Sequence, residues 1–383
     1  MNICFLLPPI ERYSPVSGGA IATKTMQKAR RLIARGHQVT VLAPASEDEA
    51  YVVGDVVPIY CPQREDLNVV QRGISHYLRK FRRWDWLYFE YYLRSARRAL
   101  RRLPRQPDAV LVFNDLITPR HVKRILPRAK VLCMLSNEIR TNQKDIRRTV
   151  AATHKIVCVS RYIQEWTTAR YGIPAEKIMA VPNGADTETF KPRPGYLSPA
   201  SPVKVLCLGR IDPNKGPDLA ADAVARLRQE GIPIALTVAG GLWFYNHGGE
   251  SSDPYFVSLQ EKIKAAGGEY LGHVTRPDIP ALVRRHDIAC VLSRSNDPMP
   301  QTLFEAMASG LAVVASDRGG IPEGCNGAGW LVNVEDFGKI VAALRDLATI
   351  PPVLNEYKQR SVARAAKATW DTNVDALEQV LLN

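Results

Sequence analysis

Short apolar runs recur along the chain, and most are followed by a segment in which apolar residues recur with helical spacing. In the first half these runs span residues 2–7, 38–43, 109–113, 130–135 and 155–160. In the second half they span residues 203–208, 235–239, 289–292 and 311–315. Strands buried on both faces of a parallel sheet are apolar throughout, and the connections between them are helices. The pattern therefore predicts an α/β protein built on parallel sheets.

The alternation is interrupted between residues 191 and 202, where the sequence KPRPGYLSPASP is rich in proline, serine and glycine. Such a composition is typical of linkers. The chain has 383 residues, which is enough for two domains that each bury a core. We expect two doubly wound domains that face each other across a cleft, one over residues 1–197 and one over residues 198–368.

One βαβ unit of the second domain carries candidate chemistry. The apolar run at residues 287–292 ends in a polar turn that contains Asp297, and a helical run over residues 301–308 follows. A second carboxylate, Glu305, falls in the first turns of that helix. Ligands of open α/β sheets bind at this carboxyl edge of the strands.

The first amides of the predicted helix and the two carboxylates favour different partners. Free N–H groups at a helix N-terminus, here those of Gln301 and Thr302, attract phosphate. Asp297 and Glu305 would be repelled by phosphate, so hydroxyl groups are their natural partners. Phosphate on the amides and sugar hydroxyls on the carboxylates together describe a sugar nucleotide.

Five motifs along the chain extend this interpretation. They are Ser17-Gly18-Gly19 with Ala34-Arg35-Gly36-His37, Val181-Pro182-Asn183-Gly184-Ala185-Asp186, Leu208-Gly209-Arg210-Ile211-Asp212-Pro213-Asn214-Lys215-Gly216, Asp297-x7-Glu305 with Ala-Met-Ala-Ser-Gly, and Gly319-Gly320-Ile321-Pro322-Glu323. In order and spacing these motifs resemble those of retaining glycosyltransferases of the GT-B fold, which has two Rossmann-like domains, and in particular family 4 (group 1). The resemblance also implies a C-terminal helix, at residues 369–383, that packs back on the first domain.

The resemblance implies an activity and roles for the candidate residues. The activity is transfer of a hexosyl unit from a nucleotide-diphospho-sugar, UDP- or GDP-linked, to an acceptor hydroxyl in glycan, glycolipid or glycosylated metabolite biosynthesis. Glu305 would bind the ribose hydroxyls, and Asp297, which stands where glutamate is commoner, would contact the transferred sugar. Gly18 and Gly19 would let the donor phosphate approach the backbone, although a tight turn alone also accounts for a glycine here.

Two cations flank the turn that follows the apolar run at residues 203–208. Arg210 and Lys215 can clamp a diphosphate from both sides and stabilise negative charge on the leaving nucleotide. The sequence has no Asp-x-Asp of metal-dependent glycosyltransferases, no His-Glu-x-x-His and no cysteine quartet. We therefore expect a metal-independent enzyme without a cofactor.

The acceptor side departs from the pattern of the resembled family. Many retaining members carry a histidine after a strand of the first domain, but here the run at residues 130–135 is followed by Ser136, Asn137 and Glu138. A front-face mechanism needs no protein base, because the leaving phosphate can take the proton of the acceptor. Asn137 and Glu138 are the candidate acceptor-side residues.

The net charge of +13 is distributed unevenly. Eleven Lys and Arg residues stand between Arg72 and Arg105, interleaved with Trp, Tyr and Phe and opposed only by Asp85 and Glu90. This pattern favours an anionic membrane surface or an anionic acceptor such as a lipid-linked pyrophosphate sugar. The alternative is a solvated helix pair whose aromatic residues pack in the first domain. No nucleic-acid-binding module accompanies the basic residues, so nucleic acid is not an expected partner.

The remaining features concern the compartment and competing functions. No apolar run approaches the roughly 20 residues of a membrane span, and MNICFLLPPI predicts a buried strand rather than a signal peptide. Seven cysteines without CxxC pairing indicate free thiols in a reducing compartment. We expect a cytoplasmic protein, peripheral on the inner face of the membrane through Arg72–Arg105. Two alternatives stay open: a sugar-nucleotide 2-epimerase or a phosphorylase of the same fold, and a non-catalytic sugar-nucleotide-binding protein.

Overall fold

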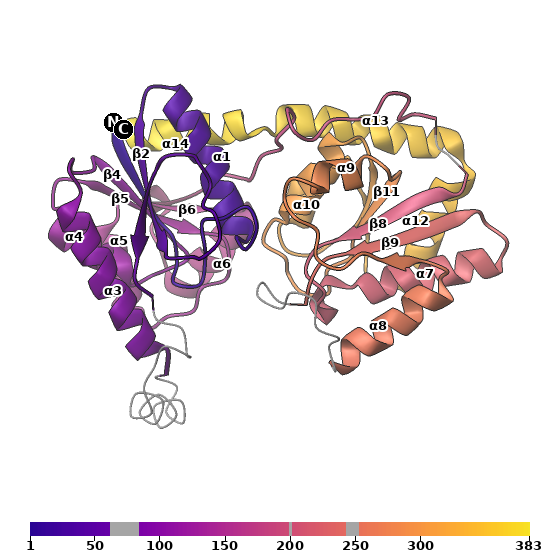
Figure 1. The fold of residues 1–383 in the computed structure, drawn as a ribbon, viewed down its shortest axis with the longest axis horizontal. Coiled ribbons are helices and arrows are strands. Elements are labelled where there is room, and N and C mark those ends of the chain that lie inside the picture. Colours follow the sequence, from indigo (N-terminus) through magenta and orange to yellow (C-terminus); the bar gives the residue numbers. More distant parts are fainter. Residues whose placement is uncertain (62–83, 199–200, 243–252) are drawn as a thin grey trace. The chain divides into compact units, whose positions relative to one another are not determined.

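The computed structural model describes residues 1–61, 84–198, 201–242 and 253–383 (Figure 1). The chain divides into two compact units. Unit 1 comprises Met1–Val159, Ile163–Val181 and Ala376–Asn383, and unit 2 comprises Ser160–Tyr162 and Pro182–Asp375. Each unit is built on one parallel sheet, as the apolar runs predict.

Unit 1 contains a seven-stranded sheet in the order β3-β2-β1-β4-β5-β6-β7. Its strands are β1 (Asn2–Leu6), β2 (Gln38–Pro44), β3 (Asp55–Ile59), β4 (Ala109–Phe113), β5 (Lys130–Leu135), β6 (Lys155–Cys158) and β7 (Ile178–Ala180). The helices are α1 (Ala20–Ala34), α3 (Trp84–Arg102), α4 (Thr118–Ile125), α5 (Gln143–Ala152) and α6 (Arg161–Tyr171), with a 3-10 turn at Ala175–Lys177. The central strands β1, β4 and β5 are almost wholly buried, which explains their uniformly apolar sequence.

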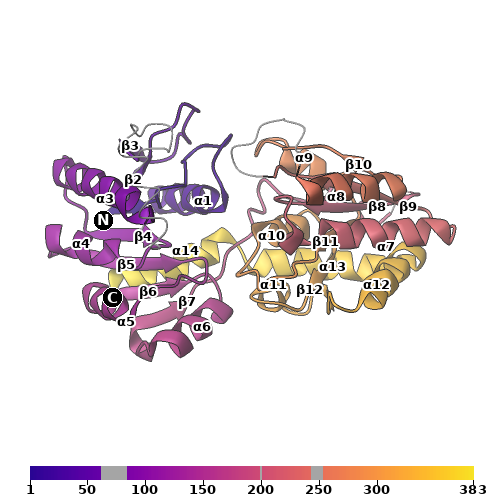
Figure 2. The same ribbon diagram turned by 90° about the horizontal axis from the view of Figure 1, so that it is seen from below.

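Unit 2 contains a six-stranded parallel sheet in the order β10-β9-β8-β11-β12-β13 (Figure 2). Its strands are β8 (Val203–Leu208), β9 (Ile234–Ala239), β10 (Glu269–Tyr270), β11 (Ile288–Val291), β12 (Ala312–Ser316) and β13 (Trp330–Val332). The helices are α7 (Pro217–Gln229), α8 (Pro254–Ala265), α9 (Ile279–Val283), α10 (Gln301–Ala308), α11 (Ile321–Cys325), α12 (Phe337–Thr349), α13 (Pro351–Lys367) and α14 (Trp370–Leu382), and a 3-10 turn spans Pro213–Lys215.

The core of unit 2 lies between its sheet and its helices. Helix α7 packs against α8 and α12, and α10 packs against α13. The apolar faces of α7 and α12 close over the strands with fully buried side chains, including those of Leu227, Ile340 and Leu344. Burying a leucine or isoleucine side chain contributes about 1.5–3 kcal/mol to the free energy of folding. The packing of α7 and α12 therefore stabilises the position of the strands that they cover.

The units divide at Val181 rather than at the expected boundary after residue 197. The segment after Val181 is held by unit 2, because Ala185 forms a β-bridge with Thr369 and Asn183 donates to the carbonyl of Met299 at 3.0 Å. Residues 191–198 and 201–202, whose composition is typical of linkers, contain no helix or strand and belong to unit 2. Helix α14 is shared: its residues up to Asp375 belong to unit 2 and the remainder to unit 1.

The C-terminal part of α14 is joined to unit 1 by side-chain contacts. Glu378 accepts hydrogen bonds from Arg35 at 2.8 Å and contacts His37 at 2.7 Å. Lys130 donates to the carbonyl of Leu381 at 2.9 Å. The His37 and Arg35 hydrogen bonds hold the pKa of the Glu378 carboxyl below its usual value. The Ala-Arg-Gly-His motif thus has a structural role in fixing the last helix.

Candidate functional site

Loops with polar side chains follow three neighbouring strands of unit 2. Strand β8 ends at Leu208, β11 at Val291 and β12 at Ser316. The three strands are adjacent and parallel, so their carboxyl ends meet at one edge of the sheet. Six predicted site residues lie in the segments that follow β8 and β11: Arg210, Lys215, Asp297, Gln301, Thr302 and Glu305.

The turn after β8 carries the two cations of the predicted diphosphate clamp. Arg210 lies 3.1 Å from a carboxylate oxygen of Asp212 and keeps 37% of its side chain exposed. Asp212 also accepts a hydrogen bond from the amide of Asn214 at 2.8 Å, which caps the 3-10 turn that ends at Lys215. The turn therefore fixes the spacing between the two cations while leaving both side chains partly open to solvent.

Lys215 and Asp297 join the loops that follow β8 and β11. The ammonium group of Lys215 donates to Oδ2 of Asp297 in a short ion pair. Asp297 is 6% exposed, and its Oδ1 accepts from the amide of Met299 at 3.2 Å. The carboxylate is thus held by one cation and one amide at the carboxyl edge of the sheet.

Two glycines after β12 support the Asp297 loop through backbone packing. A Cβ atom on Gly319 would lie 2.3 Å from the carbonyl oxygen of Asp297, and one on Gly320 would lie 1.8 Å from that of Pro298. The amide of Gly320 donates to the Asp297 carbonyl at 2.8 Å. Any side chain larger than hydrogen would displace the loop. The Gly-Gly motif therefore sets the position of Asp297.

The N-terminus of helix α10 has no capping side chain, but the residues next to it are held in place by other hydrogen bonds. Pro300 occupies the N-cap position and provides no side-chain hydrogen bond to the helix. The Gln301 side chain donates to the carbonyl of Gly184 at 3.0 Å, and Asn183 holds the carbonyl of Met299. A helix without a capping side chain leaves its first amides available to an anion.

Glu305 is the most buried acidic residue of the candidate site. Its side chain is 1% exposed, and Oε1 accepts a hydrogen bond from Arg276 at 2.8 Å. Its second oxygen, Oε2, is buried and has no hydrogen-bond partner among the residues that the structure describes. A buried acceptor left unpaired costs about 1–3 kcal/mol, so this oxygen favours a ligand that donates a hydrogen bond, such as a hydroxyl group.

A second ion pair fixes the turn that carries Lys215. Arg294 donates to both carboxylate oxygens of Asp218, at 2.8 and 2.5 Å, and to the carbonyl of Pro213 at 2.8 Å. Tyr255 donates to the same carboxylate at 2.8 Å. Burial alone would raise the pKa of Asp218, but the hydrogen bonds from Arg294 and Tyr255 hold it below its usual value. Asp218 and Arg294 act as support for the turn.

Several residues that hold this site were not predicted from the sequence. Arg276 precedes α9, in a stretch without a motif, and Asn183 belongs to a motif whose function the pattern did not specify. Asp218 and Arg294 look like ordinary surface charges in the sequence. Their roles depend on partners 29 to 116 positions away along the chain, as for Arg276 with Glu305 and Asn183 with Met299.

The glycine-rich loop of unit 1 forms a tight turn before α1. A Cβ atom on Gly18 would lie 2.2 Å from the carbonyl oxygen of Ser14, so this turn requires glycine at that position. Gly19 is the N-cap of α1, and Glu11 accepts a hydrogen bond from the helix amide of Ala22 at 2.7 Å. A carboxylate of unit 1 therefore already occupies part of this helix N-terminus. Contact of Gly18 and Gly19 with a donor phosphate stays a prediction.

The candidate acceptor-side residues follow β5 in unit 1. The amide of Ser136 donates to the side chain of Asn114 at 2.6 Å, so Ser136 is part of the turn structure at this edge. Asn137 is exposed and Glu138 is half-buried. Their role in binding an acceptor stays a prediction.

The basic stretch is described only in its second half. Residues 72–83, with Arg79, Lys80, Arg82 and Arg83, lie outside the described residues, as do the side chains of residues 84–88. Among the described side chains of α3, Tyr92 is fully buried and donates to the carbonyl of Leu7 at 2.7 Å, next to Phe89. The arginines are on the outside, with Arg94, Arg98, Arg101 and Arg102 exposed and Arg97 half-buried.

Solved structures that align over nearly the whole chain identify the class of fold. A sucrose-phosphate synthase from Thermosynechococcus elongatus aligns over 99% of this chain and 98% of its own, with a TM-score of 0.76 and 14% identity. HepE from Anabaena, solved in complex with UDP and glucose, aligns over 100% of this chain and 99% of its own, with a TM-score of 0.71 and 17% identity. The protein has the GT-B fold.

Family comparisons narrow this class. Residues 21–189 match the model described as Glycosyltransferase Family 4, and residues 190–367 match the model described as Glycosyl transferases group 1. The chain belongs to the group 1 glycosyltransferases.

Named relatives match this chain over different shares of their own length. A lipopolysaccharide 1,2-N-acetylglucosaminetransferase of Salmonella typhimurium is 26% identical over 84% of this chain and 82% of its own length. A phosphatidyl-myo-inositol mannosyltransferase of Mycolicibacterium smegmatis is 27% identical over 92% and 87%. The putative glycosyltransferase YtcC of Bacillus subtilis is 24% identical, and the match spans only 56% of each chain.

Among the described residues, no helix is both long and apolar enough to cross a bilayer.

Proposed function

We propose that the protein is a retaining, metal-independent hexosyltransferase that uses a nucleotide-diphospho-sugar. The observation that carries this proposal is the buried Glu305 carboxylate. One of its oxygens accepts from Arg276, and the other has no partner within the described part of the chain. A vicinal diol such as that of ribose supplies hydroxyl donors to an unpaired carboxylate oxygen. The open first turn of α10 supports a phosphate position close in sequence to the same residue.

The proposed reaction exchanges one bond at the anomeric carbon of the sugar. The bond between that carbon and the diphosphate oxygen breaks, and a bond to the acceptor oxygen forms on the same face. The proton of the acceptor hydroxyl passes to the leaving phosphate oxygen, so no protein base is required. Arg210 and Lys215 stabilise the charge that develops on the leaving diphosphate, in the place where other enzymes use a divalent ion.

Asp297 has the role of holding the transferred sugar in this proposal. Its ion pair with Lys215 places a carboxylate next to one of the proposed phosphate-binding cations. A sugar hydroxyl can share the carboxylate, while the Lys215 ammonium retains donors for a phosphate oxygen. The pair therefore supports a shared boundary between the sugar and diphosphate positions.

The acceptor class and the compartment belong to the same proposal. Named relatives act on lipopolysaccharide and on phosphatidyl-myo-inositol, and we propose a glycan, lipid-linked or small-molecule acceptor for this chain.

The exposed arginines of α3 favour a cytoplasmic protein that binds an anionic membrane surface. Burial and the nearby charges of Arg120, Arg124 and Arg97 lower the pKa of His121, which supports a positive surface across α3 and α4.

Two measurements test the proposal directly. A thermal-shift screen with UDP-, GDP- and ADP-sugars should show stabilisation by one donor class, by about 2.7 kcal/mol at 100 times its Kd. NMR of the product with that donor should show the same anomeric configuration as in the donor, in buffer containing EDTA. Inversion of configuration, or loss of turnover in EDTA, would contradict the mechanism. Donor binding with neither transfer nor hydrolysis would favour the non-catalytic alternative, and a changed sugar in the nucleotide would favour the epimerase.

A further inference from the structure

Unit 2 contains a positively charged hollow that no part of the proposed reaction uses. The hollow has a volume of about 510 Å³. Five cationic side chains line it: Lys191, Arg193, Lys204, Arg284 and Arg285. No acidic residue is among the described residues that line it.

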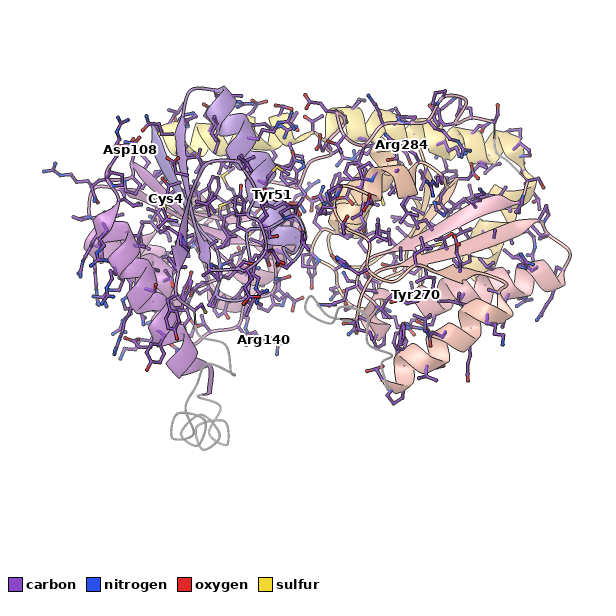
Figure 3. All side chains as sticks on the ribbon, in the orientation of Figure 1. Cys4, Tyr51, Asp108, Arg140, Tyr270 and Arg284 are labelled. Carbon is purple, nitrogen blue, oxygen red and sulfur yellow. The ribbon has the colours of Figure 1, made fainter. Side chains whose placement is uncertain are left out.

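The hollow lies at the opposite edge of the sheet from the candidate donor site. Lys204 is at the amino-terminal end of β8, whereas Arg210 follows its carboxyl end. Arg284 and Arg285 lie between α9 and the start of β11. Because β8 and β11 are parallel neighbours, these residues share the amino edge, and we call this place the amino-edge hollow. Figure 3 shows Arg284 on the side of unit 2 away from Tyr270.

One buried carboxylate organises the cations around the hollow. Asp287 is fully buried and accepts hydrogen bonds from Arg193 at 3.0 Å, from Lys358 at 2.7 Å and from the amide of Lys204 at 3.1 Å. Arg193 also reaches the carbonyl of Arg284, at 3.5 Å. A single negative charge is thus shared by two cations, and Arg193 is held in place at the wall of the hollow.

The other four cations of the hollow have no such compensation. Within the described ranges of the chain, no carboxylate oxygen lies within 4.0 Å of Lys191, Lys204, Arg284 or Arg285. Lys191, Lys204 and Arg285 are exposed, and Arg284 is half-buried. Like charges gathered around a concave surface produce a positive potential that concentrates anions. The arrangement favours a ligand with more than one negative charge.

The size and walls of the hollow narrow the class of ligand. Its volume falls within the roughly 300–1,000 Å³ of small-molecule sites and is larger than a single phosphate needs. Pro192, Pro194 and Ala281 supply apolar wall beside the cations. Guanidinium groups match the geometry of phosphate oxygens with two parallel donors. We propose that the amino-edge hollow binds a phosphorylated small molecule carrying at least two negative charges, separate from the sugar-nucleotide donor.

Calorimetric titration with ATP and with pyrophosphate tests this proposal. The full chain is compared with the variant Arg284→Gln with Arg285→Gln and with a charge-matched control, Lys264→Gln with Lys367→Gln, whose lysines are exposed elsewhere on unit 2. All three proteins also carry Arg210→Ala, so that phosphate binding at the donor loops is weakened equally. We expect the Kd for ATP or pyrophosphate to rise about tenfold or more in the hollow variant alone, because each lost charge-assisted hydrogen bond costs about tenfold in affinity.

A second arm separates a soluble ligand from a lipid headgroup. The same proteins are sedimented with vesicles of phosphatidylglycerol and with neutral phosphatidylcholine vesicles. Loss of binding to the anionic vesicles in the hollow variant alone would support a phosphate headgroup as the occupant. Equal behaviour of the hollow variant and its control toward ATP, pyrophosphate and anionic vesicles would overturn the proposal. Lys191→Gln provides a milder variant on an exposed segment, and it should weaken binding in the same direction.

Discussion

Arg276 donates to one carboxylate oxygen of Glu305 at 2.8 Å, and the other oxygen of this buried residue has no partner in residues 1–61, 84–198, 201–242 and 253–383. The arrangement keeps the carboxylate oriented before any ligand is bound. Preorganised acceptors of this kind give specificity for a hydroxyl-bearing ligand, because the ligand removes the cost of an unpaired buried oxygen.

The first prediction contrasts the two carboxylates of the site. Glu305→Gln should raise the KM for the donor with a smaller change in kcat, because its proposed partner is the ribose. Asp297→Asn should mainly lower kcat, because its proposed partner is the transferred sugar. Steady-state kinetics distinguishes the two effects, with exposed Glu261→Gln on α8 as control. The reverse pattern would exchange the two roles.

The second prediction concerns the cations after β8. Arg210→Ala and Lys215→Ala should each reduce kcat/KM by roughly 10²-fold or more, the scale found for removal of a preorganised charge donor. Lys264→Ala, an exposed lysine on α8, should be neutral. The melting temperature should change little in Arg210→Ala and Lys264→Ala and should fall in Lys215→Ala, because this change leaves the buried Asp297 carboxylate without its cation. Near-normal turnover of both site variants would refute the diphosphate clamp.

The third prediction uses the close packing of Gly320 on the Asp297 loop. Gly320→Ala places a methyl group where the carbonyl oxygen of Pro298 lies, so the loop must move. We expect a fall in kcat of roughly 10²-fold, since a shift of about 1 Å at a catalytic group has this effect. Gly338→Ala, on an exposed face of α12, is the control and should leave kcat unchanged. Unaltered turnover in Gly320→Ala would show that the position of the Asp297 loop is not critical.

The fourth prediction is a pH dependence at Asp218. Its pKa in the folded protein lies below the usual value of 3.8, because hydrogen bonds from Arg294 and Tyr255 outweigh the effect of burial. Stability from the ionised carboxylate is therefore present above about pH 3.8 and is lost as the pH falls through the lower folded pKa. Asp218→Asn should lower the melting temperature at pH 7, by about 2–4 °C for each kcal/mol lost, and the difference from the wild type should shrink in acid. A difference that is constant from pH 7 to acid would argue against this ionic contribution.

The fifth prediction concerns the arginines of α3. If the helix binds an anionic membrane, each charge near the surface contributes about 1 kcal/mol and is screened by salt. Replacement of Arg97, Arg98, Arg101 and Arg102 by Gln should abolish salt-sensitive sedimentation with anionic vesicles, while donor binding in a thermal-shift assay stays unchanged. A wild-type protein that ignores such vesicles at low salt would leave these arginines as a solvated helix face.

The sequence predicted the buried strands better than the edge strands. Strands β4, β5 and β8 match the expected ranges to the residue, because a central parallel strand is apolar along its whole length. The edge strands β3 and β10 were not expected. Strand β3 contains Pro58 and exposed positions, and β10 has only two residues, so neither produces an apolar run.

The residues of the candidate site could also be predicted only in part. Residues in loops after central strands, such as Lys215 and Asp297, could be chosen because their place in the topology and their charge coincide. The ion pair between those two, and the contact of Arg276 with Glu305, depend on which side chains the folded loops bring together. Linear spacing carries no signal for such contacts, because the partners belong to separate loops.

The division of α14 between the two units has a consequence for how the chain folds during its synthesis. The strands of unit 1 are translated before unit 2, but the residues from Ala376 onward, including the Glu378 that binds Arg35 and His37, are translated only after unit 2. Domains generally fold in order as they emerge. Here unit 1 lacks one of its packed helical segments until all of unit 2 has been synthesised, so it cannot complete its folding before then. We therefore expect nascent chains that stop within unit 2 to expose the surface that α14 covers and to depend on chaperones.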